Sequence, residues 1–192
     1  MNDIEKTLIE KCKNNDINAF EKLIFDYQKK VFNICYRYLE NYDDASELAQ
    51  EVFIKIYKGI SGFKEQSLLS TWIYKITVTT CIDEIRKRKK YNTVSIDDTE
   101  RIIEIVDYDD SPCENIEKQE VKKEILNAIN RLNEEHKTVI ILRDIQGLSY
   151  EEIAQSLDVP LGTIKSRIKR ARENIKQYLL KSGNFFPKAT SY

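Results

Sequence analysis

The chain has 192 residues, of which 41% are hydrophobic and 33% are charged, and its 31 Lys and Arg nearly balance its 32 Asp and Glu. Five Gly and three Pro are too few for a turn-rich sheet protein, so the composition favours an all-helical fold of one medium or two small domains. The N-terminal segment has no apolar core of signal-peptide length, and no apolar run approaches the roughly 18 residues of a membrane span. We therefore expect a cytoplasmic protein that does not insert into a membrane by itself.

The chemistry of metal sites and of enzymes has no clear signature here. The cysteines Cys12, Cys35, Cys81 and Cys113 are scattered along the chain, and His136 is its single histidine. This spacing does not match a zinc site, and a disulfide framework is not expected in the cytosol. Cys35 and Cys81 are interpreted as small buried hydrophobic residues. Because no nucleophilic triad or phosphate loop is found either, we expect no catalytic residue, metal or cofactor.

Two amphipathic helices are predicted first along the chain. From Ile17 to Leu39, apolar residues recur at helical spacing and form one stripe. A second stripe runs from Ala45 to Ile60. Asp43 or Asp44 is the expected N-cap of that helix, and the glycine at position 59 marks its end.

The next segment, STWIYKITVTTCIDEIRKRKK, has an ambiguous pattern. Its Thr, Ile, Val and Tyr content favours a strand, whereas the spacing of its apolar residues suits a helix. Ser70 is a plausible N-cap, and the basic run from Arg86 to Lys90 is typical of a helix C-terminus. We predict a helix, because a single strand would have no partner in this chain.

The composition changes sharply from Ser95 to Glu120, where ten acidic residues face two basic ones. The segment has a formal charge of −8, which leaves +7 on the rest of a chain whose total is −1. Like charges repel along such a segment, so we predict an extended, mostly unfolded linker. A solvated loop with no further role fits the same residues equally well.

The helical pattern returns at Val121 and stops at Gly147. Ser149, followed three residues later by Glu152, forms a capping box that begins a predicted helix from Tyr150 to Leu157. After a short break at 158–160, a long basic helix begins near Leu161.

This last helix lies in the segment Pro160–Ser182, which holds seven basic residues and one acid. Ile164, Ile168, Ala171 and Ile175 recur at helical spacing and form its expected buried face. Two helices joined by a tight turn, with the second one basic, are typical of a helix-turn-helix, whose second helix enters the major groove of DNA. Arg and Lys can contact guanine edges there, and further cations neutralise phosphates. The residues expected on the outward face are Thr163, Lys165, Ser166, Arg167, Lys169 and Arg170.

At this point the sequence resembles a known family. The segment LNEEHKTVIILRDIQGLSYEEIAQSLDVPLGTIKSRIKRAR is similar to the promoter-recognising C-terminal domain of bacterial sigma factors, in particular the extracytoplasmic-function (ECF) group. AFEKLIFDYQKKVFNICYRYL, DDASELAQEVFIKIY and STWIYKITVTTCIDEIRKRKK resemble, in order, the opening, core-polymerase-binding and promoter-melting helices of that family's first domain. Four such motifs in family order are far more specific than any one of them.

The resemblance implies an all-α protein with two small helical domains joined by an acidic flexible linker. The expected boundaries are 1–92 for the N-terminal domain, 93–120 for the linker, 121–182 for the helix-turn-helix domain and 183–192 for a tail. The implied function is that of a non-catalytic subunit that directs RNA polymerase to promoters. The implied partners are core RNA polymerase, promoter DNA and an anti-sigma factor.

The resemblance also assigns residues to these partners. The minus-thirty-five element would be contacted by the outward face of the last helix. Docking on core polymerase would use Glu47, Gln50 and Glu51. Capture of a flipped base, melting and contacts at the minus-ten element would use Lys64, Gln66, Ser67, Trp72, Lys75, Arg86, Arg88 and Lys89. Trp72 suits core packing equally well, and Val78 and Thr79 stand where the family often has Arg and Asn.

Two other functions are weighed against this one. A two-domain transcriptional regulator could carry a similar helix-turn-helix and bind DNA alone, but it would need neither the docking pattern nor the melting segment. An enzyme is disfavoured by the missing catalytic signatures.

Overall fold

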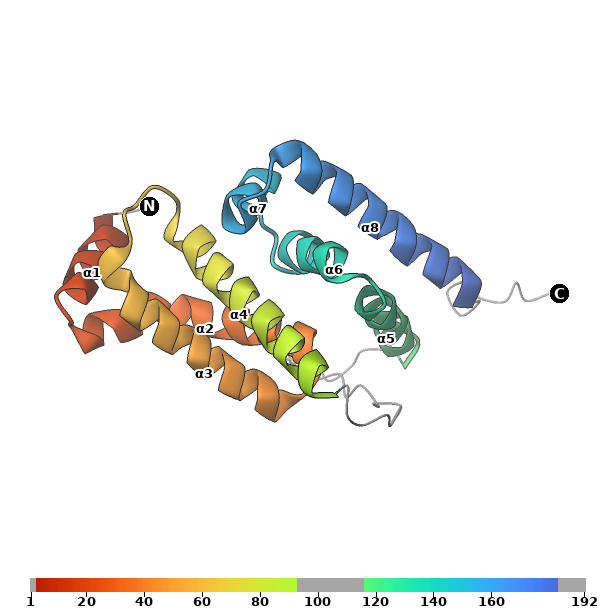
Figure 1. Ribbon diagram of the computed structural model, residues 1–192, viewed down its shortest axis with the longest axis horizontal. Helices are drawn as coiled ribbons and strands as arrows, with labels where there is room; N and C mark the ends of the chain where they lie inside the picture. The colour runs from red at the N-terminus through yellow and green to blue at the C-terminus, as the bar shows by residue number, and fades with distance from the viewer. Residues whose placement is uncertain (1–2, 93–115, 183–192) are drawn as a thin grey trace. The chain divides into compact units, whose positions relative to one another are not determined.

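The computed structural model describes residues 3–92 and 116–182, and all of the described secondary structure is helical (Figure 1). The all-α prediction is therefore confirmed for these residues. Most of the predicted linker and the whole predicted tail lie outside them. In chain order the elements are α1 (Asp3–Lys13), α2 (Ile17–Leu39), α3 (Tyr42–Gly59), the 3₁₀ turn η1 (Ile60–Gly62), α4 (Leu69–Asn92), α5 (Ile116–Asn130), α6 (Glu134–Ile140), the π turn η2 (Ile141–Ile145), α7 (Tyr150–Leu157) and α8 (Leu161–Ser182).

These elements belong to two compact units, and each unit is described by itself. Unit 1 contains α1 to α4 with η1, and α7 is grouped with them. Unit 2 contains α5, α6, η2 and α8. The division between Val159 and Pro160 falls inside the predicted helix-turn-helix.

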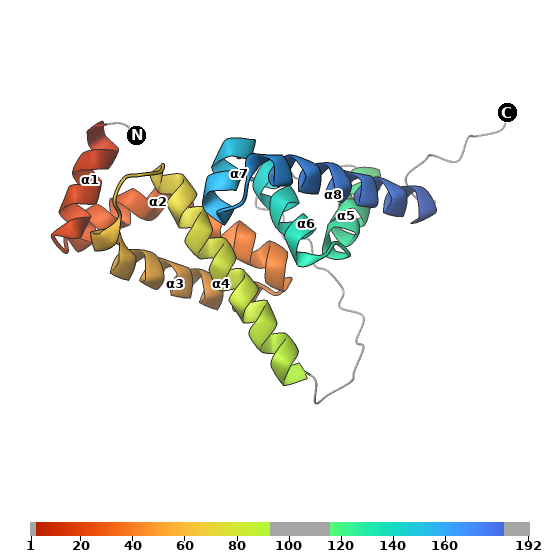
Figure 2. The same ribbon diagram turned by 45° about the horizontal axis from the view of Figure 1, so that its top comes forward.

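In unit 1, α2 packs against α1, α3 and α4, and α3 also packs against α4 (Figures 1 and 2). The apolar stripes predicted for α2 and α3 supply this core, including Val31, Ile34, Val52 and Ile56, none of which is exposed to solvent. Such burial is the main favourable contribution to folding. The prediction that Cys35 and Cys81 are buried is confirmed, and their sulfur atoms lie 3.8 Å apart between α2 and α4.

The ends of the unit 1 helices correct some predictions. Asn41 caps α3, because its side-chain oxygen accepts a hydrogen bond from the Asp44 backbone N–H, so Asp43 and Asp44 lie in the first turn. The ambiguous segment is a helix, as predicted, but α4 begins at Leu69, which excludes Ser70 as its N-cap. Helix α1 was not predicted, and it has only two buried residues, at positions 9 and 12.

In unit 2, α5 and α6 pack against α8 (Figures 1 and 2). Four consecutive residues across α6 and η2, from Val139 to Leu142, are almost completely buried. Asn133 caps α6 by accepting a hydrogen bond from the His136 backbone N–H. Helix α5 begins at Ile116, so the end of the predicted linker 93–120 is helical.

Candidate functional site

Helix α8 has one buried stripe and one exposed basic face. Ile164, Ile168 and Ala171 are between 0% and 2% exposed, whereas Ile175, also predicted for the buried face, is only half-buried. At 100° per residue, the positions opposite this stripe fall within about half of the helix circumference. The exposed side chains on that opposite side include Lys165, Ser166, Lys169 and Arg170, and the acid Glu173 follows them further along the helix. The structure thus brings four of the six predicted DNA-contacting residues onto one surface.

The other two predicted residues of α8 lie at the edges of that surface. Thr163 is half-buried in the first turn. Arg167 is also half-buried, and its Nη2 atom lies 2.7 Å from Oε1 of Glu135 on α6. Further along α8, the Arg172 guanidinium donates two hydrogen bonds to the Asp144 carboxylate. These two ion pairs connect the flanks of α8 to the α6–η2 segment. The centre of the basic face is therefore formed by the exposed residues Lys165, Ser166, Lys169 and Arg170.

The connection before α8 has the local geometry that the sequence predicted. Ser149 and Glu152 form the capping box, in which each side chain accepts a hydrogen bond from the other residue's backbone N–H. Helix α7 ends at Leu157, and the next residue, Asp158, has a φ of 56°, the left-handed conformation common at helix C-termini. Both helices of the predicted motif therefore exist with the expected bounds.

In unit 1, the segment 61–68, which begins within η1 and ends before α4, holds three of the predicted minus-ten residues and is called the 61–68 loop. Lys64 and Gln66 are exposed, and Ser67 is half-buried. Phe63 is 5% exposed and its ring centroid lies 5.2 Å from that of Trp72. The Trp72 ring also lies against Gly59, where a Cβ atom would be 3.2 Å from the ring. Packing therefore accounts for at least part of the Trp72 surface.

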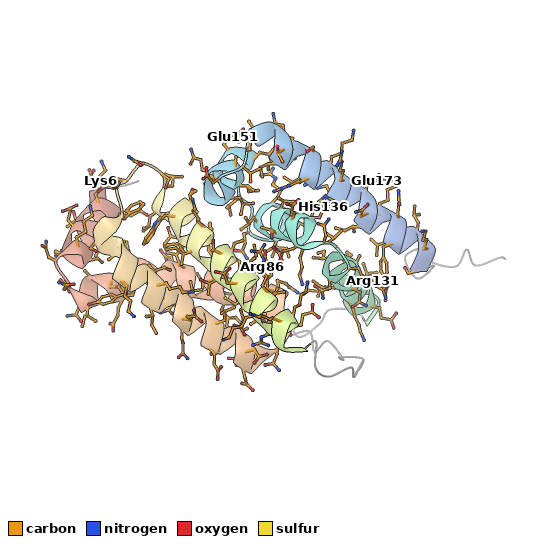
Figure 3. All side chains as sticks on the ribbon, viewed as in Figure 1. Lys6, Arg86, Arg131, His136, Glu151 and Glu173 are labelled. Atoms are coloured by element: carbon orange, nitrogen blue, oxygen red, sulfur yellow. The ribbon has the colours of Figure 1, made fainter. Side chains whose placement is uncertain are left out.

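Further cations lie along α4. Lys75, Arg86 and Lys89 are exposed, and Figure 3 labels Arg86 on this helix. Thr79 is exposed and donates a hydrogen bond to the Lys75 carbonyl, whereas Val78 is buried.

Arg88 is bound within unit 1. Its guanidinium donates hydrogen bonds to Asp44 on α3 and to Glu84 on α4, and the bond to Asp44 is the main cause of its raised pKa. We conclude that in this structure Arg88 connects the end of α4 to the start of α3, a role that its spacing in the sequence did not reveal.

The three predicted docking residues lie on one exposed side of α3, and all of Glu47, Gln50 and Glu51 are accessible to solvent. Glu51 also forms an ion pair of 2.8 Å with Lys55, which donates a hydrogen bond to Thr80 on α4. Beside them is a polar hollow of about 160 Å³, lined by Asp44, Glu47, Leu48, Glu51, Glu84, Lys87 and Arg88. The docking prediction did not include the part of this hollow that α4 supplies.

Neither a metal-binding cluster nor a membrane-spanning helix is found in the part of the chain that the structure describes. Residues 3–92 and 116–182 include no cluster of three or more His, Cys, Asp or Glu side chains arranged to hold a metal ion. Among the described helices, none is both long enough and apolar enough to cross a membrane.

Comparison with protein families identifies two regions of the chain. Residues 23–91 match the family described as Sigma-70 region 2, and residues 122–175 match Sigma-70, region 4. The first match contains α3, the 61–68 loop and most of α4, and the second contains most of α8. Together they define a sigma factor built from these two regions.

Comparison with individual proteins gives the subgroup. The chain is 35% identical over 179 residues to the "ECF RNA polymerase sigma factor SigW" of Bacillus subtilis, which covers 91% of this chain and 96% of the relative. It is 34% identical over 183 residues to the "ECF RNA polymerase sigma-E factor" of Haemophilus influenzae, covering 90% and 93%. The chain belongs to the ECF RNA polymerase sigma factors, which are transcription initiation factors.

Solved structures have the same fold. The sigma factor RpoE of Bartonella quintana, determined in complex with the anti-sigma factor NepR, superimposes with a TM-score of 0.69 at 23% identity, covering 85% of this chain and 98% of that one. CnrH, determined in complex with the cytosolic domain of CnrY, gives a TM-score of 0.69 at 18% identity, covering 94% and 99%.

Proposed function

We propose that this ECF sigma factor binds core RNA polymerase through α3 and directs it to promoters through the basic face of α8 and the 61–68 loop. The observation that carries the proposal is the outward face of α8. There Lys165, Ser166, Lys169 and Arg170 are exposed, opposite a fully buried apolar stripe. This is the arrangement with which the second helix of a helix-turn-helix enters the major groove.

At the minus-thirty-five element, Lys165, Lys169 and Arg170 donate hydrogen bonds to base edges or phosphates, and Ser166 and Thr163 supply smaller polar contacts. Arg167 has a different role in this proposal. Its ion pair with Glu135 leaves it poorly placed for a bidentate guanine contact, so it positions α8 on α6.

At the minus-ten element, Lys64, Gln66 and Ser67 contact a base that leaves the stack, and Lys75, Arg86 and Lys89 bind the backbone. Extruding a base costs unstacking energy, which polar contacts to its edge offset. Trp72 packs against Phe63 of the loop, and its exposed part can stack on a base. Arg88 acts through its ion pairs, by fixing the end of α4.

Regulation by an anti-sigma factor is part of the proposal. It is supported by the two structures of similar fold, RpoE and CnrH, which were determined with NepR and with the cytosolic domain of CnrY. An inhibitor of this kind would cover the acidic face of α3 or the basic face of α8.

Reconstitution with bacterial core polymerase tests the proposal. The full-length chain should bind core enzyme stoichiometrically and should start transcription at defined sites in a pool of promoter fragments. A variant with Glu47, Gln50 and Glu51 changed to Lys should bind core at least about tenfold more weakly, because complementary interfaces tolerate charge reversal poorly. Its melting temperature should be nearly unchanged, since all three side chains are exposed and the Glu51–Lys55 pair that is lost is a weak surface ion pair.

Two results would contradict the proposal. Full competition for core polymerase by the triple Lys variant would exclude docking through this face of α3. Sequence-specific binding to DNA in the absence of polymerase, with no binding to core, would instead indicate a free transcriptional regulator.

A further inference from the structure

Glu65 has an unusual backbone conformation for its place in the chain. Its φ is 56°, a left-handed backbone angle that residues other than Gly rarely adopt. Among the described residues, Asn15, Glu40 and Asp158 share this feature, but each lies within two residues of the end of a helix, and its backbone N–H donates to a carbonyl of that helix. Glu65 lies inside the 61–68 loop, where no helix end requires the strained conformation. Strain of this kind persists when the surrounding structure imposes it.

The surrounding structure includes helix α1. The Lys13 ammonium lies 3.2 Å from Oε1 of Glu65, across 52 positions of sequence, and donates a hydrogen bond to it. Both side chains are partly shielded from solvent, at 24% and 34% exposure, so the pair is screened less than a fully exposed one. Lys13 also forms an ion pair of 2.8 Å with Glu10, one turn earlier on α1, and this second contact does not involve the loop.

Apolar packing supports the same connection. Helix α1 packs against η1, the turn that begins the loop. Ile9 and Cys12 on α1 are buried, as are Ile60 in η1 and Phe63 directly after it. The loop is therefore fixed on α1 at its first residues and again at Glu65, and the two exposed residues beside Glu65 are Lys64 and Gln66.

We infer that α1 is a positioning element for the minus-ten loop, in which Lys13 holds Glu65 in its left-handed conformation and so fixes the directions in which Lys64 and Gln66 leave the backbone. This inference rests on the proposed function of the loop. Helix α1 lies before the matched Sigma-70 region 2, which begins at residue 23. The positioning contact is therefore supplied by a segment outside the matched region.

Holding these two side chains in fixed directions has a consequence for specificity. A loop that is ordered before DNA arrives does not have to be ordered on binding, so more of the contact energy appears as affinity for the correct base. Without the ion pair, Lys64 and Gln66 would sample several directions, and discrimination between bases would decrease more than binding to the phosphate backbone.

The experiment uses full-length variants and two measurements. Lys13→Ala and Glu65→Gln each remove the ion pair, the double variant Lys13→Glu/Glu65→Lys restores it with reversed charges, and Glu10→Gln is the matched control, since it removes only the second partner of Lys13. Amide hydrogen exchange of residues 61–68 in the free protein reports loop order. Transcription by the reconstituted holoenzyme from a pool of promoter fragments with a randomised minus-ten segment reports base preference.

We expect faster exchange in the loop and an approximately two- to fivefold weaker base preference for each single variant. The charge-reversed pair should recover both properties, and Glu10→Gln should change neither.

A triple variant, Lys64→Ala/Gln66→Ala/Ser67→Ala, separates this inference from the proposed function. If the triple variant loses base preference while Lys13→Ala and Glu65→Gln keep wild-type exchange and preference, the role of α1 is overturned and the function of the loop stands. If the triple variant itself keeps the wild-type preference, the loop does not contact bases and both proposals fail.

Discussion

Helices α3 and α8 are built alike on the inside and oppositely on the outside. Each has one apolar stripe in the core of its own unit, with Val52 and Ile56 on α3 and Ile164 and Ile168 on α8 all at most 2% exposed. The outward side of α3 carries acidic residues that include Glu47 and Glu51, whereas that of α8 carries mainly Lys and Arg. The same helical pattern thus presents opposite charges, and in the proposed function this difference suits the face of α3 to a protein partner and the face of α8 to DNA.

The largest expected effects test whether the apolar stripes of α3 and α8 are both packed in a core. Ile56→Ala on α3 and Ile168→Ala on α8 should each lower the free energy of unfolding of their unit by ~2–5 kcal/mol, because each leaves a cavity in a packed core. Urea titration of both variants measures this, with Ile4→Ala as a control, since Ile4 is 72% exposed. Similar losses in both variants would support the comparison, and a loss below about 1 kcal/mol in either would contradict the assigned core.

The next effect tests the basic face of α8 by itself. Arg170→Ala should weaken binding to the cognate promoter by ~1–3 kcal/mol and relax the preference at one position, if the arginine contacts a base edge. The melting temperature should not change, since the side chain is exposed. Lys181→Ala, near the end of α8, is the control and should alter only general, salt-dependent affinity. Equal promoter binding by Arg170→Ala and wild type at moderate salt would exclude Arg170 from the contact surface.

A smaller effect distinguishes the two possible roles of Arg167. If it positions α8 through Glu135, then Arg167→Ala and Glu135→Gln should reduce promoter affinity by similar factors, roughly two- to fivefold, and the double variant should be no weaker than either. If Arg167 contacts a guanine, as the sequence first indicated, Arg167→Ala alone should cost ~1–3 kcal/mol and Glu135→Gln should have no such effect. Promoter binding by the holoenzymes, measured at one salt concentration, decides between them.

The smallest effect concerns the corresponding ion pairs of unit 1. Arg88→Ala removes the contacts to Asp44 and Glu84 and should lower the free energy of unfolding by less than about 1 kcal/mol, because the Arg88 and Asp44 side chains are each 36% exposed. The difference should shrink further at high ionic strength. Lys89→Ala, one residue along α4, should leave stability unchanged and reduce only DNA binding. A stable Arg88→Ala variant with a DNA-binding defect equal to that of Lys89→Ala would assign Arg88 to DNA instead.

Local sequence patterns allowed many of the helix bounds and core residues to be predicted. The capping box at Ser149 and Glu152, the bounds of α7 and the start of α8 depend on residues within a few positions of one another, and all three predictions are confirmed. The apolar stripes of α2 and α3 identified the core for the same reason. The N-cap of α3 was wrong because Asn41, Asp43 and Asp44 are all good capping residues, and only the backbone conformation selects among them.

Predictions that depend on distant contacts could not be made in this way. Glu65, the second partner of Lys13, is 52 positions away from it, and the partner of Arg167 lies on another helix. A basic side chain that will form an internal ion pair looks the same in the sequence as one that will meet DNA. For this reason Arg88 and Arg167 were included among the DNA-contacting residues, and only the folded chain revealed their distant partners, Asp44 and Glu135.

The positions of the cysteines allow the unfolding of unit 1 to be followed by chemical modification. Cys12, Cys35 and Cys81 are all buried in unit 1, and the fourth cysteine, Cys113, lies outside the described residues. With Cys113 changed to Ser, an alkylating reagent can react only when unit 1 opens enough to admit it. The rate of modification then follows the opening of unit 1, whatever happens in unit 2, which carries α8. A bound partner that closes unit 1 would protect all three sulfurs together, and the protection could be followed by mass spectrometry without any label on the partner.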